Sequence, residues 1–245
     1  MTAKALILAT VAWLTAGATP SDRVVVQMVS KDNEPAQAIV QRSDGTVWMM
    51  SAEVNGRLTD DYQIGTAATL PASLKRKLPK SEVPIHFVKC GRAKDEIAIF
   101  ASATLKRDSA DGSVDRFDRL WFFNAQGQSL GRYAADFTDE IECVPHPQNI
   151  YVAVTEGMRN TSIRLFRAAN GRVHEVLHPD VEIDAHETDD LKTDRTMVLL
   201  IQLEDAGVFA DDLGRPKTER TIRRTYILNR SGSAWRKQKE VIEYR

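Results

Sequence analysis

The sequence is poor in cysteine, in long apolar runs and in net charge. Its 245 residues include two cysteines, and 33 basic against 34 acidic side chains give a formal net charge of -1. A charge so close to zero favours neither a nucleic acid nor an anionic membrane as partner. Patterns for a Gly-x-Ser-x-Gly elbow, a P-loop and a dinucleotide site are also missing, and we expect no cofactor.

Residues 1–18 have the three regions of a secretory signal peptide. Lys4 precedes an apolar run from Ala5 to Leu14, and small residues follow before Pro20. A buried first helix is the alternative, but the run is too short to span a bilayer, and no other stretch is apolar enough to do so. Cleavage leaves 19–245 with a formal charge of -2, because Lys4 is lost. We therefore predict a periplasmic or secreted protein with no membrane insertion after cleavage.

A pattern of strands and turns occurs twice in the middle of the chain. When Cys90 is placed over Cys143, the apolar strand at 97–99 falls over the strand at 150–152. An aromatic strand with a glycine turn, 120–127, likewise matches 163–171. Each copy predicts a four-stranded antiparallel meander.

The two cysteines occupy the same position in these adjacent copies. Their strands can therefore lie side by side, and export would place both thiols in an oxidising compartment. We predict a disulfide between Cys90 and Cys143 that contributes about 4 kcal/mol. Two separate buried thiols are the alternative.

The whole mature chain divides into four such units in a single all-β domain at 19–245. The predicted units are 23–68, 84–136, 137–179 and 180–245. Meander units of this length with aromatic third strands resemble the blades of a small or incomplete β-propeller. A β-sandwich is the alternative fold.

A short basic segment links the first two units. Proline at its start and spaced leucines predict a two-turn helix over 71–78. The adjacent bases Lys75, Arg76, Lys77 and Lys80 form a basic spot. Runs of charge are usually solvated, and a solvated linker is the expected reading.

An acidic loop runs from Asp108 to Asp118. Loops with acids around a glycine can wrap calcium, which prefers several carboxylate and carbonyl oxygens. An EF-hand would need acids or amides at Arg107 and Ser109, so we predict an ordinary exposed polar loop.

Residues 174–178 read His-Glu-Val-Leu-His, which resembles the HExxH motif of zinc peptidases, with an acid ten residues after the first histidine. The resemblance implies a secreted zinc peptidase in which His174, His178 and Asp184 bind zinc and Glu175 is the general base. Val181 stands where the metzincin-like form of this motif has glycine.

The repeat predicts a different conformation for the same segment. It places the fourth strand of its unit directly after Gly171, and Pro179 ends that strand. In a strand, His174 and His178 would lie about 13 Å apart, too far to share one metal. Two other histidines, His86 and His146, stand near the cysteines and could pair as ligands, but we expect structural roles for both.

These observations predict an exported, non-enzymatic domain that binds another protein, as an inhibitor or immunity protein against a toxin or cell-wall hydrolase. Recognition would use the charged segments 106–118, 185–195 and 205–219, which we predict to be long loops. The alternatives are the zinc peptidase and an envelope- or carbohydrate-binding module. The module would use Trp48, Trp121, Trp235 and Tyr62, although aromatic strand residues more often pack into the core.

Overall fold

A computed structural model describes the chain over most of its length. The described residues are 22–28, 37–52, 58–92, 95–107, 113–135, 137–144, 146, 149–157, 162–176, 187–194, 197–210, 216–231 and 234–244. The predicted signal peptide at 1–18, together with His178, Asp184 and loop residues 108–112, lies outside this set. No helix among the described residues is long and apolar enough to cross a membrane.

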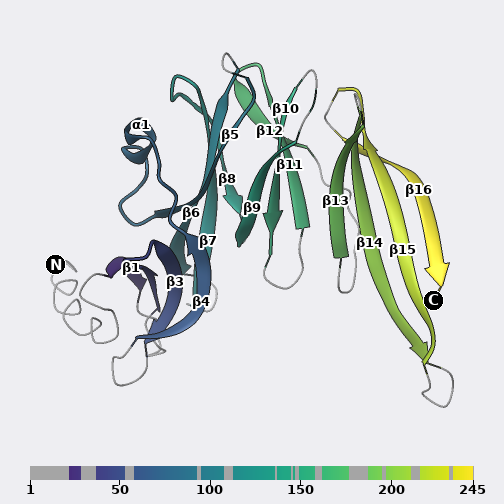
Figure 1. Cartoon of the computed structure of the whole chain (residues 1–245), viewed down its shortest axis with the longest axis horizontal. Coiled ribbons are helices and arrows are strands. Elements are labelled where there is room, and N and C mark those ends of the chain that lie inside the picture. The colour runs from purple at the N-terminus through teal and green to yellow at the C-terminus, as the bar shows by residue number, and fades with distance from the viewer. Residues whose placement is uncertain are drawn as a thin grey trace, which may run out of the picture. The chain divides into compact units, whose positions relative to one another are not determined.

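The protein is all-β, as the sequence predicts, and its strands form four antiparallel sheets of four strands each (Figure 1). Each sheet takes four consecutive strands in chain order, which is the predicted meander. The strands are β1 Arg23–Met28, β2 Gln37–Gln41, β3 Thr46–Ala52, β4 Leu58–Thr66, β5 Val83–Cys90, β6 Ile97–Arg107, β7 Val114–Asn124, β8 Ser129–Ala135, β9 Thr138–Val144, β10 Ile150–Glu156, β11 Ser162–Ala169, β12 Arg172–Val176, β13 Glu187–Asp194, β14 Met197–Ala210, β15 Pro216–Leu228 and β16 Trp235–Tyr244.

The two predicted copies of the repeat are the sheets β5–β8 and β9–β12. Cys90 ends β5 and Cys143 lies in β9, while Ile97 and Ile150 begin the second strand of each copy. Both copies turn from the third strand to the fourth at a glycine with positive φ, 74° in the first copy and 71° in the second. Glycine adopts this left-handed backbone conformation without strain, which explains why a glycine marks the turn in both copies of the sequence.

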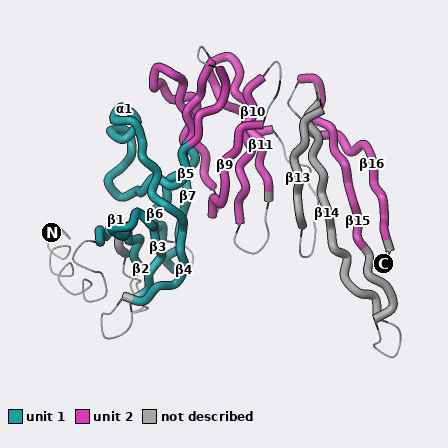
Figure 2. The backbone as a smooth tube through the Cα atoms, in the orientation of Figure 1, with its two compact units in different colours: residues 1–87, 100–120 teal, residues 88–99, 121–245 magenta. Residues whose placement is uncertain are grey.

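The chain separates into two compact units, shown in different colours in Figure 2. Unit 1 contains residues 1–87 and 100–120, and unit 2 contains residues 88–99 and 121–245. The division passes through the sheet β5–β8, whose strands β5, β6 and β7 each contribute residues to both units.

Unit 1 has an apolar core on both faces of its strands. On one face of the first sheet, Ala38, Val40 and Met50 form a buried cluster against which Val24 and Trp48 pack. All β6 residues of this unit from 100 to 105 are buried, including the alternate polar positions Ser102 and Thr104. A strand with both faces covered is expected to carry such a continuous apolar run.

Unit 2 contains two groups of packed apolar side chains. Phe122, Phe166 and Tyr133 bring ring centroids within 5.0–5.8 Å of one another. The second group is built from Val144, Tyr151, Ala153, Leu165, Val176 and Leu228, with Ile163 and Trp235 packed against it. Strands from three sheets, β5–β8, β9–β12 and β13–β16, therefore contribute to the interior of this unit.

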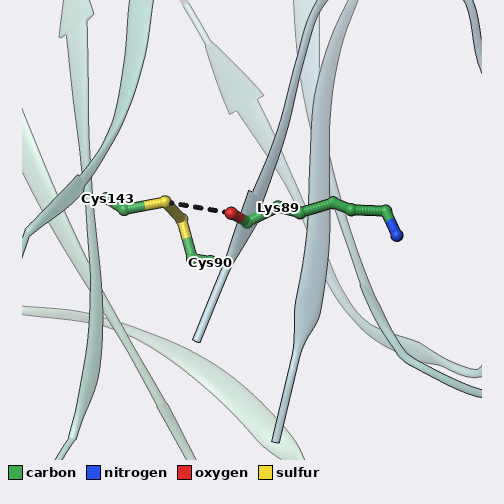
Figure 3. The surroundings of a disulfide bond; sticks show 3 residues. All are labelled: Lys89, Cys90 and Cys143. Atoms are coloured by element: carbon green, nitrogen blue, oxygen red, sulfur yellow. Dashed lines mark hydrogen bonds between the residues drawn. A yellow bond between two sulfur atoms is a disulfide. The ribbon is translucent and has the colours of Figure 1, made fainter. Parts of the chain in front are cut away.

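A disulfide joins Cys90 to Cys143 and confirms the predicted pairing (Figure 3). It links β5 to β9, the first strands of the two repeat copies. The Cys143 Sγ atom also lies 3.3 Å from the carbonyl oxygen of Lys89. This is a sulfur–oxygen contact, since a disulfide sulfur carries no proton to donate. Cys90 is 1% exposed whereas Cys143 is exposed, so one end of the bridge reaches the surface.

The helix after the first sheet is shorter than predicted. Instead of two turns over 71–78, α1 spans Ala72–Lys75, with Pro71 before it and Arg76 as its last cap. The chain then tightens, because the Lys77 and Leu78 amides donate to carbonyl oxygens three residues back. Pro79 prevents Leu78 from continuing as a helix.

Two of the three predicted recognition loops are largely strands. The segment 185–195 contains β13, and 205–219 contains the end of β14 and the start of β15. β13 is an edge strand, where polar residues are tolerated, and its backbone pairs with β14 from Glu187 to Asp194. The β14–β15 register shifts once between Asp205 and Val208 and once between Phe209 and Ala210, so the hairpin continues through a polar stretch.

The third predicted loop, 106–118, is also shorter than expected. β6 continues to Arg107 and β7 starts at Val114. Strand pairing therefore overrides a composition that favours a loop.

Candidate binding cleft

Unit 1 contains a cleft of about 330 Å³ beside the short helix. Its lining comes from β1, β2, the segment after β4, the region of α1 and the start of β5. The lining residues are Arg23, Val25, Gln41, Ala67, Ala68, Thr69, Leu70, Lys75, Leu78, Pro79, Lys80, Glu82, Val83 and Pro84. This volume is at the lower end of the range for ligand pockets, about 300–1,000 Å³.

Backbone hydrogen bonds hold the walls of the cleft. Ala67 forms an isolated bridge with Ile85, and the Ala68 amide donates to the Pro84 carbonyl oxygen at 2.8 Å. Leu74 is 4% exposed and anchors α1 by its side chain. Main-chain hydrogen bonds and the buried Leu74 side chain fix the backbone of residues 67–70 and of α1, which carries cleft side chains.

Glu82 is the one acidic residue among the described residues that line the cleft. It is 5% exposed, and Ser102 donates a hydrogen bond of 2.6 Å to its carboxylate. The Arg119 guanidinium forms an ion pair with the same carboxylate. A buried carboxylate is tolerated when it is paired and hydrogen-bonded, so Glu82 needs no further cation.

Three cationic side chains line the same cleft: Arg23, Lys75 and Lys80. All three are exposed. Within the part of the chain that the structure describes, no carboxylate forms a salt bridge with any of them. The charge of Glu82 is already balanced by Arg119, so the three remaining cations leave the cleft with an excess of positive charge.

The basic spot predicted from the sequence divides between the cleft and the open surface. Lys75 and Lys80 line the cleft, whereas Arg76 and Lys77 do not. The sequence did not indicate Arg23, which lies in β1 far from Lys75 along the chain and reaches the cleft because β1 and the segment after β4 both line it. Glu82 is close to Lys75 in the sequence, but its burial and its pairing with Arg119 depend on the fold.

Unit 2 has a second cleft, of about 280 Å³, among the turns at one end of its strands. Ile97, Leu130 and Ile150 are its large apolar residues, and three turns contribute polar side chains to its lining. Gly91 fits closely here, because a Cβ atom on it would lie 2.7 Å from the Ile150 Cδ1 atom. The charges around this cleft are mixed, which gives it no clear ligand preference.

The described part of the HExxH-like segment, 174–176, is extended in the structure. His174 and Glu175 lie in β12, paired with Arg167 and Phe166 of β11, as the repeat predicts. The two oxygens of the Glu175 carboxylate each accept a 2.7 Å hydrogen bond from the Arg164 guanidinium. The motif of a zinc peptidase is helical and keeps this glutamate free to polarise water, so this geometry does not suit that chemistry.

The other candidate metal ligands do not gather. No group of three or more His, Cys, Asp or Glu side chains is placed to hold a metal ion among the described residues. Asp118, in the predicted acidic loop, lies in β7 and binds Arg116. His86 lies in β5, and His146 accepts a hydrogen bond from the Asn149 amide and meets the Tyr151 ring edge-on.

The aromatic residues proposed for carbohydrate binding belong mainly to the interior. Trp121 is 8% exposed, Trp235 packs against the core of unit 2, and Trp48 packs in unit 1 with the Arg42 guanidinium over its ring. Tyr62 lies beside Arg116, and burial raises the pKa of its phenol despite the nearby guanidinium. None of these rings lines the cleft of unit 1.

Comparison with known proteins identifies no family. No family model matches the chain, and no curated protein matches it. Among solved structures, two of a PL25 polysaccharide lyase, an ulvan lyase, align over 90% of this chain and 55% of their own, at 8% identity and TM-scores of 0.35 and 0.36. The chain thus spans about half the length of these structures. Morganella morganii TcdA4 aligns at 11% identity with a TM-score of 0.25, over 85% of this chain and 11% of its own.

Proposed function

We propose that this protein is an exported, non-enzymatic domain that binds another protein through the cleft of unit 1. In this role it acts as an inhibitor or immunity protein against a toxin or cell-wall hydrolase in the periplasm or outside the cell. The observation that carries the proposal is the cleft itself, in which an apolar wall and converging polar side chains stand on a hydrogen-bonded backbone. Concave sites of this composition are the usual places for recognition.

The surrounding structure supports a binding role. The disulfide between Cys90 and Cys143 fits the oxidising compartment that export would provide. The segment that forms the cleft wall, 67–70, is a connection between two sheets and is fixed by backbone bonds. Connections held on a rigid β scaffold commonly carry recognition.

A pull-down from periplasmic extract tests the proposal with a matched pair of variants. Thr69→Trp places a large ring at an exposed position that lines the cleft, whereas Ser73→Trp places the same ring at an exposed position of α1 outside it. We expect wild type and Ser73→Trp to retain one stoichiometric partner and Thr69→Trp to lose it. A wild-type protein that retains no partner would contradict the binding role. Retention by Thr69→Trp would contradict the choice of site.

A further inference from the structure

We infer that the cleft of unit 1 takes a carboxylate-rich peptide segment of its partner. The inference rests on the proposed function, because it names the chemistry of the ligand at that same site. It starts from the excess of positive charge on Arg23, Lys75 and Lys80, which surround a cleft whose acidic residue is already neutralised. An anionic ligand would complete the charge balance of this surface.

The internal pairing of Glu82 is the decisive step. If its carboxylate were free, it would balance part of the charge of the lysines, and the cleft would not select an anion. Ser102 and Arg119 instead bind it from within unit 1, and it is 5% exposed. The three exposed cations therefore face the cleft without a carboxylate partner among the described residues.

The types of the cations indicate a ligand with several carboxylates. Lysine is a compact charge on a flexible stem, so Lys75 and Lys80 can follow acids at different positions. The planar guanidinium of Arg23 can instead bind one carboxylate with two parallel hydrogen bonds. A peptide with several acidic residues can pair with the two lysines and the arginine together, which a single acid cannot do.

The apolar wall favours a peptide over an acidic polysaccharide. Leu78 and Pro84, both partly exposed, offer aliphatic surface for side-chain and Cα atoms of an extended chain, beside the buried Leu70 and Val83. No aromatic ring is present among the described residues that line the cleft, so the flat face of a sugar ring has no matching platform there. A polyuronate is accordingly the ligand to exclude in the test.

Fluorescence anisotropy with the full chain tests the inference. The probe is a labelled octapeptide of alternating glutamate and alanine, and its matched control has glutamine in place of glutamate. Lys75→Glu reverses a charge that lines the cleft, whereas Arg76→Glu makes the same reversal at the next residue, which is also exposed but lies outside it. Both substitutions replace one cation by glutamate, so the two variants have equal overall charge.

We expect the acidic peptide to bind and the glutamine peptide not to bind. Lys75→Glu should weaken binding about tenfold, while Arg76→Glu should change it less than about threefold. Raising the salt concentration to about 0.5 M should weaken wild-type binding strongly, because exposed charges are screened. Equal binding of both peptides, an equal loss in both variants, or binding of polygalacturonate alone would each overturn the inference.

The two proposals fail separately. If the pull-down partner is retained by wild type and lost by Thr69→Trp, but the acidic peptide does not bind, the carboxylate inference is overturned and the protein-binding function stands. If the acidic peptide binds as expected and the pull-down yields no partner, the function is overturned while the ligand chemistry of the cleft stands.

Discussion

The two compact units are stabilised by different interactions. Unit 1 buries ion pairs, Arg116 with Asp118 and Arg119 with Glu82, and all four residues belong to or adjoin the strands β5 and β7. Unit 2 contains a disulfide between β5 and β9 and a cluster of three aromatic rings from β7, β8 and β11. Buried ion pairs thus characterise unit 1, and a cross-link and ring contacts characterise unit 2.

The buried charges of unit 1 depend on their hydrogen-bonding partners. Arg116 donates to both oxygens of Asp118, at 2.8 and 2.5 Å, and Asp118 is 0% exposed. A buried charge stripped of its partner costs far more than the intact pair contributes. The Arg116–Asp118 pair lies within β7, whereas Arg119 of β7 pairs with Glu82, which precedes β5 and lines the cleft.

The contacts of unit 2 act differently. The disulfide stabilises the fold by restricting the unfolded chain. Burial of the rings of Phe122, Phe166 and Tyr133 stabilises it without the need for an oppositely charged partner. Among its described ion pairs, unit 2 also contains Arg164, which binds both Glu156 and Glu175. Unit 1 should therefore respond most to the loss of one carboxylate and unit 2 to the loss of its cross-link.

The largest expected effect is the loss of the Asp118 carboxylate in unit 1. The Arg116 side chain is 5% exposed, and Asp118→Ala removes the carboxylate to which its guanidinium donates two hydrogen bonds. We expect the free energy of unfolding to fall by about 3–5 kcal/mol, measured by urea denaturation. Hydrogen exchange resolved by peptide should speed up in unit 1 first.

Asp115→Ala is the matched control for that change. It makes the same replacement on β7, at an exposed position, and should alter the free energy of unfolding by less than about 0.5 kcal/mol. Equal destabilisation by both substitutions would show that the buried pair is not what distinguishes unit 1.

The next effect concerns the cross-link of unit 2. Replacing both Cys90 and Cys143 with serine opens a loop with a sequence separation of 53, which should lower the free energy of unfolding by about 4 kcal/mol. Faster hydrogen exchange should appear in unit 2, in contrast to Asp118→Ala. A reducing agent should lower the urea midpoint of the wild type equally and leave the double variant unchanged. A wild-type midpoint that is insensitive to complete reduction would contradict a stabilising role for the bridge.

The same contrast explains what the sequence could and could not predict. Repeats, glycine turns and the equivalent places of Cys90 and Cys143 are local or periodic signals, and they led to the correct meander sheets and disulfide. β13 was missed because its acidic composition suits a loop, and only pairing with β14 makes it a strand. The cleft escaped prediction for a related reason. Arg23, Lys75 and Glu82 come together through contacts that no sequence period records.

The smallest expected effect is the loss of one hydroxyl from the ring cluster of unit 2. The Tyr133 hydroxyl donates a hydrogen bond to the Val173 carbonyl oxygen, so Tyr133→Phe should cost about 1 kcal/mol of unfolding free energy at pH 7. Burial, together with the negative charge of Glu175, raises the pKa of Tyr133 above its ordinary value of 10.0. A raised pKa in the folded state means that the stability linked to the neutral phenol is fully present below pH 10 and is lost as the pH rises through the folded value.

The difference between wild type and Tyr133→Phe should therefore be constant from pH 7 to 9 and shrink above about pH 10, because only the wild type can ionise at this position. Urea midpoints of the two proteins across this range measure it directly. A difference that grows with alkaline pH would mean that the folded state favours the phenolate. Tyr133 would then belong with the paired charges that characterise unit 1, and the contrast between the units would weaken at its ring cluster.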